Sequence, residues 1–310
     1  MKKTLLFFLL ILGGFLSKAQ IVDTAYVDVD GVKLFTVLTS PTQTVNPPLA
    51  IIIAGSGPTD NNGNQPLMEN NSLLFLSNEL VSNGIATLRF DKRGIARSYY
   101  EGLKEADLTI DLYGTDVEAL IDYARQKGYK DIYLLGHSEG SLLGLLAASN
   151  KEIKGFVSLC GAGNPIDVTL KKQLQSNLPP AFYNQSLEII EKLKQGEYVE
   201  NVPLQLASLF RPSVQHYMIS WLKLNPAELI KNLHCPVLVI QGSKDIQVAN
   251  EEGEALSSAD PGSTLVTIEN MNHIFKTIEG DLTENVNSYS NPSLPVNPKL
   301  VKTIVDFIRK

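Results

Sequence analysis

Continuous apolar runs alternate with segments of helical periodicity along most of this chain, and this alternation constrains the fold more than any other feature. The apolar runs lie at 49–54, 85–90, 132–135, 156–160, 237–241 and 264–269. The helical segments lie at 72–83, 108–127, 141–149, 250–258 and 298–309. Strands that are apolar on both faces need cover on both sides, which helices provide when they connect parallel strands. The pattern therefore predicts an α/β fold with a mostly parallel sheet.

Two regions depart from this alternation. The segments 25–29 and 33–38 alternate as half-buried strands do, and they meet at Asp30-Gly31, a dipeptide typical of hairpins. From about 163 to 233 the strand signals stop, and helical pieces interrupted by prolines replace them. We expect an antiparallel strand pair at the start of one domain, which covers 20–310, and a helical lid inserted at about 163–233.

The first residues have the composition of an export signal. Lys2 and Lys3 precede an apolar stretch at 5–16, and Ser17-Lys18-Ala19 supplies the small residues that signal peptidase needs. The stretch is shorter than the roughly 20 apolar residues that span a bilayer. We expect a signal peptide at 1–19, a periplasmic or secreted mature protein, and no stable membrane insertion after cleavage. A retained anchor or a buried first helix is the alternative.

Charge and composition limit the partners. The formal net charge is -6, and the sequence has no basic cluster, so a nucleic-acid partner is not expected. No His, Cys, Asp or Glu spacing typical of a metal site is visible, and no glycine-rich loop is suited to phosphate. We therefore expect no metal and no cofactor. The sequence leaves the oligomeric state open.

The cysteines provide a test of the predicted topology. Cys160 ends one predicted strand and Cys235 begins another. If these strands are parallel neighbours, the thiols lie at opposite ends of the sheet, more than about 10 Å apart at about 3.3 Å per residue. A disulfide needs α-carbons within about 7 Å of each other. We expect two free, buried thiols.

A Gly-x-Ser-x-Gly motif, residues 136–140, joins one predicted strand to the next helix. The small residues Gly136 and Gly140 let strand and helix approach closely, so the turn is sharp and holds Ser138 in strained backbone at the end of its strand. The motif is common by chance, but its position between a strand and a helix favours a nucleophilic serine.

Such a serine needs a base that removes its proton. His273 lies in a polar loop directly after the last predicted strand, and it is the base that we expect. The other three histidines are less suitable. His137 adjoins the serine and points away from it on a sharp turn, His216 lies in the predicted lid, and His234 precedes a strand at the wrong end of the sheet.

The base in turn needs a carboxylate that orients it. Asp245 follows the run 237–241 at a turn, and it is the acid that we expect. The alternatives are Glu251 and Glu252, which lie in the first turn of a helix where acids favour the helix dipole, and Asp260, which lies in a turn before a proline.

The oxyanion that forms during acyl transfer needs preorganised donors. We expect one to be the backbone N–H of Glu139 and the other to be that of Ser56, in the glycine-rich turn after the run 49–54. A merely tight strand-to-helix turn explains those glycines almost as well. The segment 91–94, Asp-Lys-Arg-Gly, is expected to support this turn by ion pairs and hydrogen bonds rather than to act in catalysis.

Five motifs in this order resemble those of a group of bacterial α/β-hydrolase esterases with an inserted helical lid. They lie at 54–60, 90–94, 136–140, 242–245 and 271–273, and the similarity covers nearly all of the mature chain. The resemblance implies an α/β-hydrolase fold and activity on short acyl esters. Ala54 departs from the wider fold, in which many members carry the histidine of a His-Gly pair. Because the donor is a main-chain N–H, this departure does not affect the expected oxyanion hole.

The sequence therefore predicts a serine esterase that cleaves a small carboxylic ester through an acyl-enzyme on a Ser138, His273 and Asp245 triad. A peptidase or amidase of the same fold is the nearest alternative, since an amide uses the same triad. The acids of the predicted lid, at 188, 191, 197 and 200, fit a solvated helix face better than an amine site. A non-catalytic binding protein on this fold is the remaining alternative. The Asn-rich loop 61–64 and the polar stretch 283–298 are expected to be mobile surface near the site.

Overall fold

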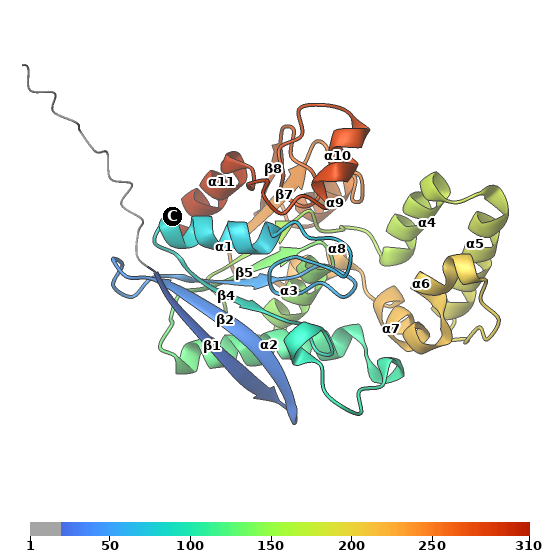
Figure 1. Cartoon of the computed structure of the whole chain (residues 1–310), viewed down its shortest axis with the longest axis horizontal. Helices are drawn as coiled ribbons and strands as arrows, with labels where there is room; N and C mark the ends of the chain where they lie inside the picture. Colours follow the sequence, from blue (N-terminus) through green and yellow to red (C-terminus); the bar gives the residue numbers. More distant parts are fainter. Residues whose placement is uncertain (1–19) are drawn as a thin grey trace, which may run out of the picture.

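The computed structural model describes residues 20–310, so the predicted export signal lies outside the described residues. Within them, eight strands form one sheet in the order β1-β2-β4-β3-β5-β6-β7-β8 (Figure 1). The strands are β1 (Gln20–Val29), β2 (Val32–Pro41), β3 (Leu49–Ile53), β4 (Ala86–Phe90), β5 (Ile132–His137), β6 (Gly155–Leu159), β7 (Val237–Gly242) and β8 (Thr264–Ile268). β2 is antiparallel to both β1 and β4, and the remaining pairs are parallel. The expected mostly parallel sheet with an antiparallel N-terminal pair is confirmed.

Helices cover both faces of the sheet because alternate residues of the central strands point to opposite faces. Ile51 and Ile53 of β3 belong to one buried cluster, whereas Ile52 belongs to the other. The first cluster is completed by α2 (Ile110–Gln126), α3 (Glu139–Asn150) and α9 (Asn250–Ala259). The second is completed by α1 (Ser72–Ser82) and α11 (Pro298–Ile308), which lie side by side in Figure 1. None of the helices in residues 20–310 has both the length and the hydropathy needed to cross a membrane.

Between β6 and β7 the chain leaves the sheet and forms a helical lobe, at the right of Figure 1. Its helices are α4 (Ile166–Asn177), α5 (Pro180–Lys194), α6 (Ala207–Phe210), α7 (Pro212–Leu222) and α8 (Pro226–Leu229). The lobe has a buried cluster of its own, which includes Leu174, Ile190 and Phe210. These helices occupy the stretch for which the sequence predicts a lid, and we call them the lid below.

The prolines of the lid begin helices rather than only interrupt them. Pro180, Pro212 and Pro226 each lie in the first turn of α5, α7 and α8. The first backbone N–H groups of a helix have no partner inside the helix, so a proline there costs no hydrogen bond. Helix α5 can therefore begin at Pro180, directly after Pro179.

Glu252 ties the start of the lid to the sheet domain. Its buried carboxylate accepts hydrogen bonds from the backbone N–H groups of Gly163 at 3.0 Å and of Asn164 at 2.9 Å. The sequence places Glu252 in the first turn of a helix, where its negative charge is expected to interact favourably with the helix dipole. The structure gives it a further role, because it fixes the point at which the chain leaves β6 for the lid.

Two segments expected to be loose surface are instead bonded into the scaffold. Asn61 of the Asn-rich loop is buried, and both its backbone N–H and its side-chain amide donate to Asp91 Oδ1 at 2.7 Å. The stretch after 280 contains a helix, α10 (Leu282–Ser288), capped by Asp281. Asn285 of this helix accepts a hydrogen bond from the Asn272 amide at 3.0 Å. The surface interpretation was wrong for Asn61 and Asn285, because these asparagines satisfy buried backbone and side-chain groups, whereas most of the stretch 283–298 is exposed.

The cysteine prediction holds for the bonding and in part for the burial. β6 and β7 are parallel neighbours, and both Cys160 and Cys235 are free thiols. Cys160 is buried, whereas Cys235 is only half-buried because it precedes β7 at the edge of the sheet.

The close approach of α3 to β3 leads to a stability prediction. A Cβ atom at Gly140 would lie 2.3 Å from the carbonyl oxygen of Ile53 and 2.7 Å from that of Ala54, so backbone would have to move. We expect Gly140→Ala to lower the free energy of unfolding by roughly 1–3 kcal/mol, measured by chemical denaturation. The control is Gly262→Ala, whose Cβ would approach only the Asp260 side chain, at 3.3 Å. Equal stability of the two variants would contradict the argument.

Candidate active site

Ser138 occupies a sharp turn between β5 and α3. Its backbone has φ 54° and ψ -119°, a region that residues other than glycine rarely adopt. The surroundings impose this conformation. The Ser138 N–H donates to the carbonyl of Leu159 in β6 at 2.9 Å, and a Cβ on Gly136 would lie 2.3 Å from the carbonyl oxygen of Gly140. The strained backbone expected from the motif is therefore present.

A cavity of about 620 Å³ opens at Ser138, between the sheet and the lid. Ser56 and Glu139 line it beside Ser138, and the lid contributes apolar side chains, among them Leu170, Leu209, Val214, Met218 and Trp221. The large apolar residues of the lid divide between two roles. Met218 and Trp221 line the cavity, whereas Phe210 is fully buried in the core of the lid.

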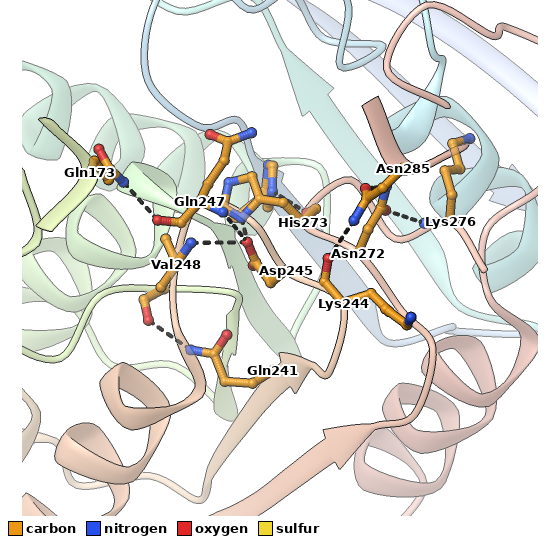
Figure 2. A network of polar contacts seen from close by, with 12 residues as sticks. Gln173, Gln241, Lys244, Asp245, Gln247, Val248, Asn272, His273, Lys276 and Asn285 are labelled. Atoms are coloured by element: carbon orange, nitrogen blue, oxygen red, sulfur yellow. Dashed lines mark hydrogen bonds and ion pairs between the residues drawn. The ribbon is translucent and has the colours of Figure 1, made fainter. Parts of the chain in front are cut away.

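Asp245 and His273 form a buried hydrogen-bonded pair (Figure 2). Asp245 follows β7 and His273 follows β8, so both come from the same edge of the sheet as Ser138. Asp245 Oδ2 lies 2.7 Å from His273 Nδ1, and the two side chains are 1% and 4% exposed. Since the carboxylate accepts from Nδ1, the other ring nitrogen, Nε2, is left unprotonated in the neutral imidazole and can act as a base.

Hydrogen bonds keep Asp245 ionised. Burial favours its neutral form, but the His273 imidazole and the backbone N–H groups of Val248 and Gln247 outweigh that effect and lower the pKa of the carboxyl group below its usual value. Those N–H groups donate to Asp245 Oδ1 at 2.9 Å and 2.7 Å. Figure 2 shows Val248 donating to this carboxylate. Asp245 can therefore carry a negative charge beside the base.

His137 is structural, as its position beside the serine suggested. Its Nε2 lies 2.9 Å from the carbonyl oxygen of His273, and because a carbonyl only accepts, Nε2 carries the proton. The ring packs against those of His273 and Phe275, each with a centroid 4.7 Å away, tilted toward the first and edge-on to the second. Burial lowers the pKa of His137 to about 3, with a further contribution from His273. A neutral His137 thus ties the turn at Ser138 to the loop that carries His273.

Two unpartnered backbone N–H groups lie on the cavity wall near the serine. Within residues 20–310, neither the Ser56 N–H nor the Glu139 N–H donates a hydrogen bond to the protein. The turn that carries Ser56 adjoins Ser138, because a Cβ on Gly55 would lie 3.2 Å from Ser138 Cβ. The Ser138 hydroxyl likewise makes no hydrogen bond within the part of the chain described here. These groups are available to a substrate.

Both carboxylates that line the cavity, Glu139 and Glu105, have cationic partners. Glu139 Oε1 lies 3.0 Å from Lys92 Nζ, and Arg211 Nε donates to Glu105 at 3.0 Å. Lys92 also donates to the carbonyl of Gly55 at 2.6 Å, so Lys92 gives the glycine-rich turn at Ser56 the support expected of the segment 91–94. Arg93 of the same segment pairs with Asp116 instead. The sequence did not identify the Glu105 and Arg211 pair. Nothing in the local pattern relates a residue before α2 to one at the start of α7.

One group in the described residues has atoms close enough to share a metal ion: Cys160, Asp245 and His273, whose potential ligand atoms lie within 4.8 Å of one another. Two of these atoms, Asp245 Oδ2 and His273 Nδ1, already bond to each other. Burial raises the pKa of the Cys160 thiol well above its usual value, and a protonated thiol is a poor ligand. The chemistry of this group suits a hydrogen-bonded acid and base better than a metal.

The depressed pKa of His137 leads to a pH prediction. Its value in the unfolded chain is near 6.5 and in the native protein about 3, so below pH 6.5 the unfolded state binds a proton that the native state does not. Stability therefore falls as the pH falls, by about 1.4 kcal/mol per pH unit. The slope reaches this value only well below pH 6.5, so we expect His137→Gln, which retains an amide donor near Nε2, to lose about 1.6 kcal/mol less than the native protein between pH 6.5 and 5. Chemical denaturation at both pH values measures this, and equal losses would refute it.

Comparison with known proteins places the chain in a family. A model of the family described as serine aminopeptidase, S33, matches residues 72–277. The esterase EstD of Thermotoga maritima is 28% identical over 244 residues, which are 76% of this chain and 56% of that protein. The chain thus spans little more than half the length of this curated relative.

Solved structures show the same fold. Est1E from Butyrivibrio proteoclasticus has a TM-score of 0.60 and 24% identity, over 93% of this chain and 99% of that one. A proline iminopeptidase from Mycobacterium smegmatis has a TM-score of 0.61 and 14% identity, over 93% and 98% of the two chains. The α/β-hydrolase fold expected from the sequence is confirmed by these likenesses. Since the family model matches most of the chain, the protein belongs to the serine aminopeptidase S33 family of α/β-fold hydrolases.

Proposed function

We propose that this protein is a serine esterase that cleaves small carboxylic esters through an acyl-enzyme, with Ser138 as nucleophile, His273 as base and Asp245 as the acid that orients the base. The observation that carries the proposal is the buried Asp245 and His273 pair at 2.7 Å, at the same sheet edge as a strained serine on a cavity wall. A non-catalytic binding protein has no need to bury this pair beside an unbonded serine hydroxyl.

The proposed reaction has two halves. In the first, His273 Nε2 takes the proton of the Ser138 hydroxyl while the oxygen attacks the ester carbonyl carbon. The negative charge on the carbonyl oxygen is accepted by the Ser56 and Glu139 N–H groups. The C–O bond to the alcohol then breaks, and His273 returns the proton to the departing alcohol. In the second half, water attacks the acyl-enzyme by the same route, and the acid and free Ser138 are released.

The charges in the cavity favour an ester over a peptide with a free amino group. An aminopeptidase needs a carboxylate for the substrate's ammonium group, but Glu105 and Glu139 are already paired with Arg211 and Lys92. The acids of α5 at 188 and 191 are exposed to solvent and do not line the cavity. The esterase EstD, a relative over three quarters of this chain, agrees with this preference. The amidase alternative rests on the name of the family.

The sequence at 1–19 supports the further proposal that the enzyme acts after export, in the periplasm or outside the cell. The same proposal includes no nucleic-acid partner and no resident cofactor, since the triad needs none.

Labelling with a fluorophosphonate probe tests the nucleophile. We expect the native protein to be modified once, at Ser138, and Ser138→Ala to remain unlabelled although folded. The matched control is Ser141→Ala, three residues further along, where the buried hydroxyl donates to Ser158 at 2.8 Å and lies outside the cavity wall. This control should be labelled as the native protein is. A folded native protein that does not react would overturn the proposal.

A substrate panel tests the reaction class. Nitrophenyl esters of graded acyl length are compared with aminoacyl nitroanilides of proline, alanine and leucine. We expect kcat/KM to be at least about 100-fold higher for the best ester, because the cavity offers no unpaired carboxylate for an ammonium group. A preference for the nitroanilides would establish the peptidase instead.

A further inference from the structure

Lys92 occupies a position that no motif of the proposed triad explains. It lies in the loop after β4, its side chain is 2% exposed, and its ammonium group has two oxygen partners. It donates to the main-chain carbonyl of Gly55 at 2.6 Å and to the Glu139 carboxylate at 3.0 Å. A buried charge is costly unless it is paired, so these contacts fix Lys92 in place. One side chain thereby links the loop after β3 to the turn after β5.

The contact with Gly55 determines the direction of the next N–H group. Gly55 C=O and Ser56 N–H belong to one peptide unit, and none of the described peptide bonds is cis. In a trans peptide the two groups point in opposite directions within one plane. An ammonium group that holds the Gly55 oxygen on one side therefore directs the Ser56 N–H to the other side. Without that hydrogen bond, a glycine on the N-terminal side of the peptide leaves the plane free to rotate.

The contact with Glu139 acts on the second donor. The Glu139 side chain is 1% exposed, and its backbone N–H is the other group proposed for the oxyanion. One carboxylate oxygen accepts from Lys92, and the other accepts from the hydroxyl of Tyr217 in α7 at 2.5 Å. Burial raises the pKa of Tyr217 well above its usual value, so the hydroxyl keeps its proton and donates. Glu139 is thus held from the sheet side by Lys92 and from the lid side by Tyr217.

We propose that Lys92 is the positioning residue of the oxyanion hole: it sets the plane of the Gly55–Ser56 peptide and, through Glu139, the start of α3, so that both N–H groups point at one oxygen. The inference rests on the proposed esterase function. Lys92 donates two of its three ammonium protons, to Gly55 and Glu139, and the proposal gives it a positioning role rather than that of an acid or base. Its effect falls on the transition state, in which the oxyanion has formed, rather than on substrate binding.

The test compares steady-state kinetics of a nitrophenyl ester in the native enzyme and Lys92→Met. We expect kcat to fall about 10- to 100-fold while KM stays within about threefold, because an interaction made only in the transition state is lost. The rate of fluorophosphonate labelling should fall as well. A variant with native kcat, or one in which KM alone rises, would overturn the inference.

Two further variants separate positioning from stability. Lys92→Met with Glu139→Gln removes both charges, which is tolerated better than one unpaired buried charge. The kcat of this double variant should remain low, because the Gly55 carbonyl still lacks its donor. A native kcat would show that Lys92 only neutralises the charge of Glu139, and it would refute the proposal. Arg93→Met with Asp116→Asn is the matched control, since it removes the adjacent buried ion pair, which lies outside the cavity wall. Its kcat, corrected for the folded fraction by circular dichroism at low temperature, should be native.

The same assays separate this inference from the proposed function. If the native protein neither hydrolyses esters nor reacts with the probe, the esterase proposal fails and Lys92 has no oxyanion hole to position. If the native protein does both and the Lys92 variants match its kcat, only the inference fails.

Discussion

The contact of α3 with β3 is the constraint on which the rest of the site depends. Gly140 lies so close to the carbonyl groups of Ile53 and Ala54 that no larger residue fits. This approach forces the turn at Ser138 into backbone of high energy, and it also brings the loop after β3 against the serine. A single packing requirement between a helix and a strand thus gathers the nucleophile and the glycine-rich turn at one place.

Several buried polar side chains around the site form hydrogen bonds with main-chain atoms of the loops. His137 binds the carbonyl of His273, Glu252 binds the first N–H groups of the lid, and Asp91 binds the Asn-rich loop. Each of these side chains is buried, and each satisfies backbone that has left regular structure. Loops that carry the proposed reactive groups, and the start of the lid, are in this way tied to the scaffold by buried hydrogen bonds.

The sequence was sufficient for the sheet and for the order of the proposed site residues, because both depend on local patterns. Continuous apolar runs specify buried parallel strands, and the residues that follow them fall at one sheet edge. Helix α10 was missed because it is short and polar, with its cap at Asp281 rather than an apolar face as its signal. The contacts of Tyr217 with Glu139 and of Arg211 with Glu105 join residues 78 and 106 positions apart, and no local pattern encodes such pairs.

The lid has a core of its own, and this has a consequence for how the sequence of the lid can change during evolution. β6 and β7 pair directly, residue by residue from Phe156 with Val237, although the whole lid is inserted between them. The lid has an apolar cluster of its own, although Tyr217 and Trp221 also pack against one of the two clusters of the sheet. The register of the sheet therefore does not depend on the length or the sequence of the insertion. Selection can therefore change much of the lid that lines the cavity without altering the sheet, as long as the hydrogen bond from Tyr217 to Glu139 is kept.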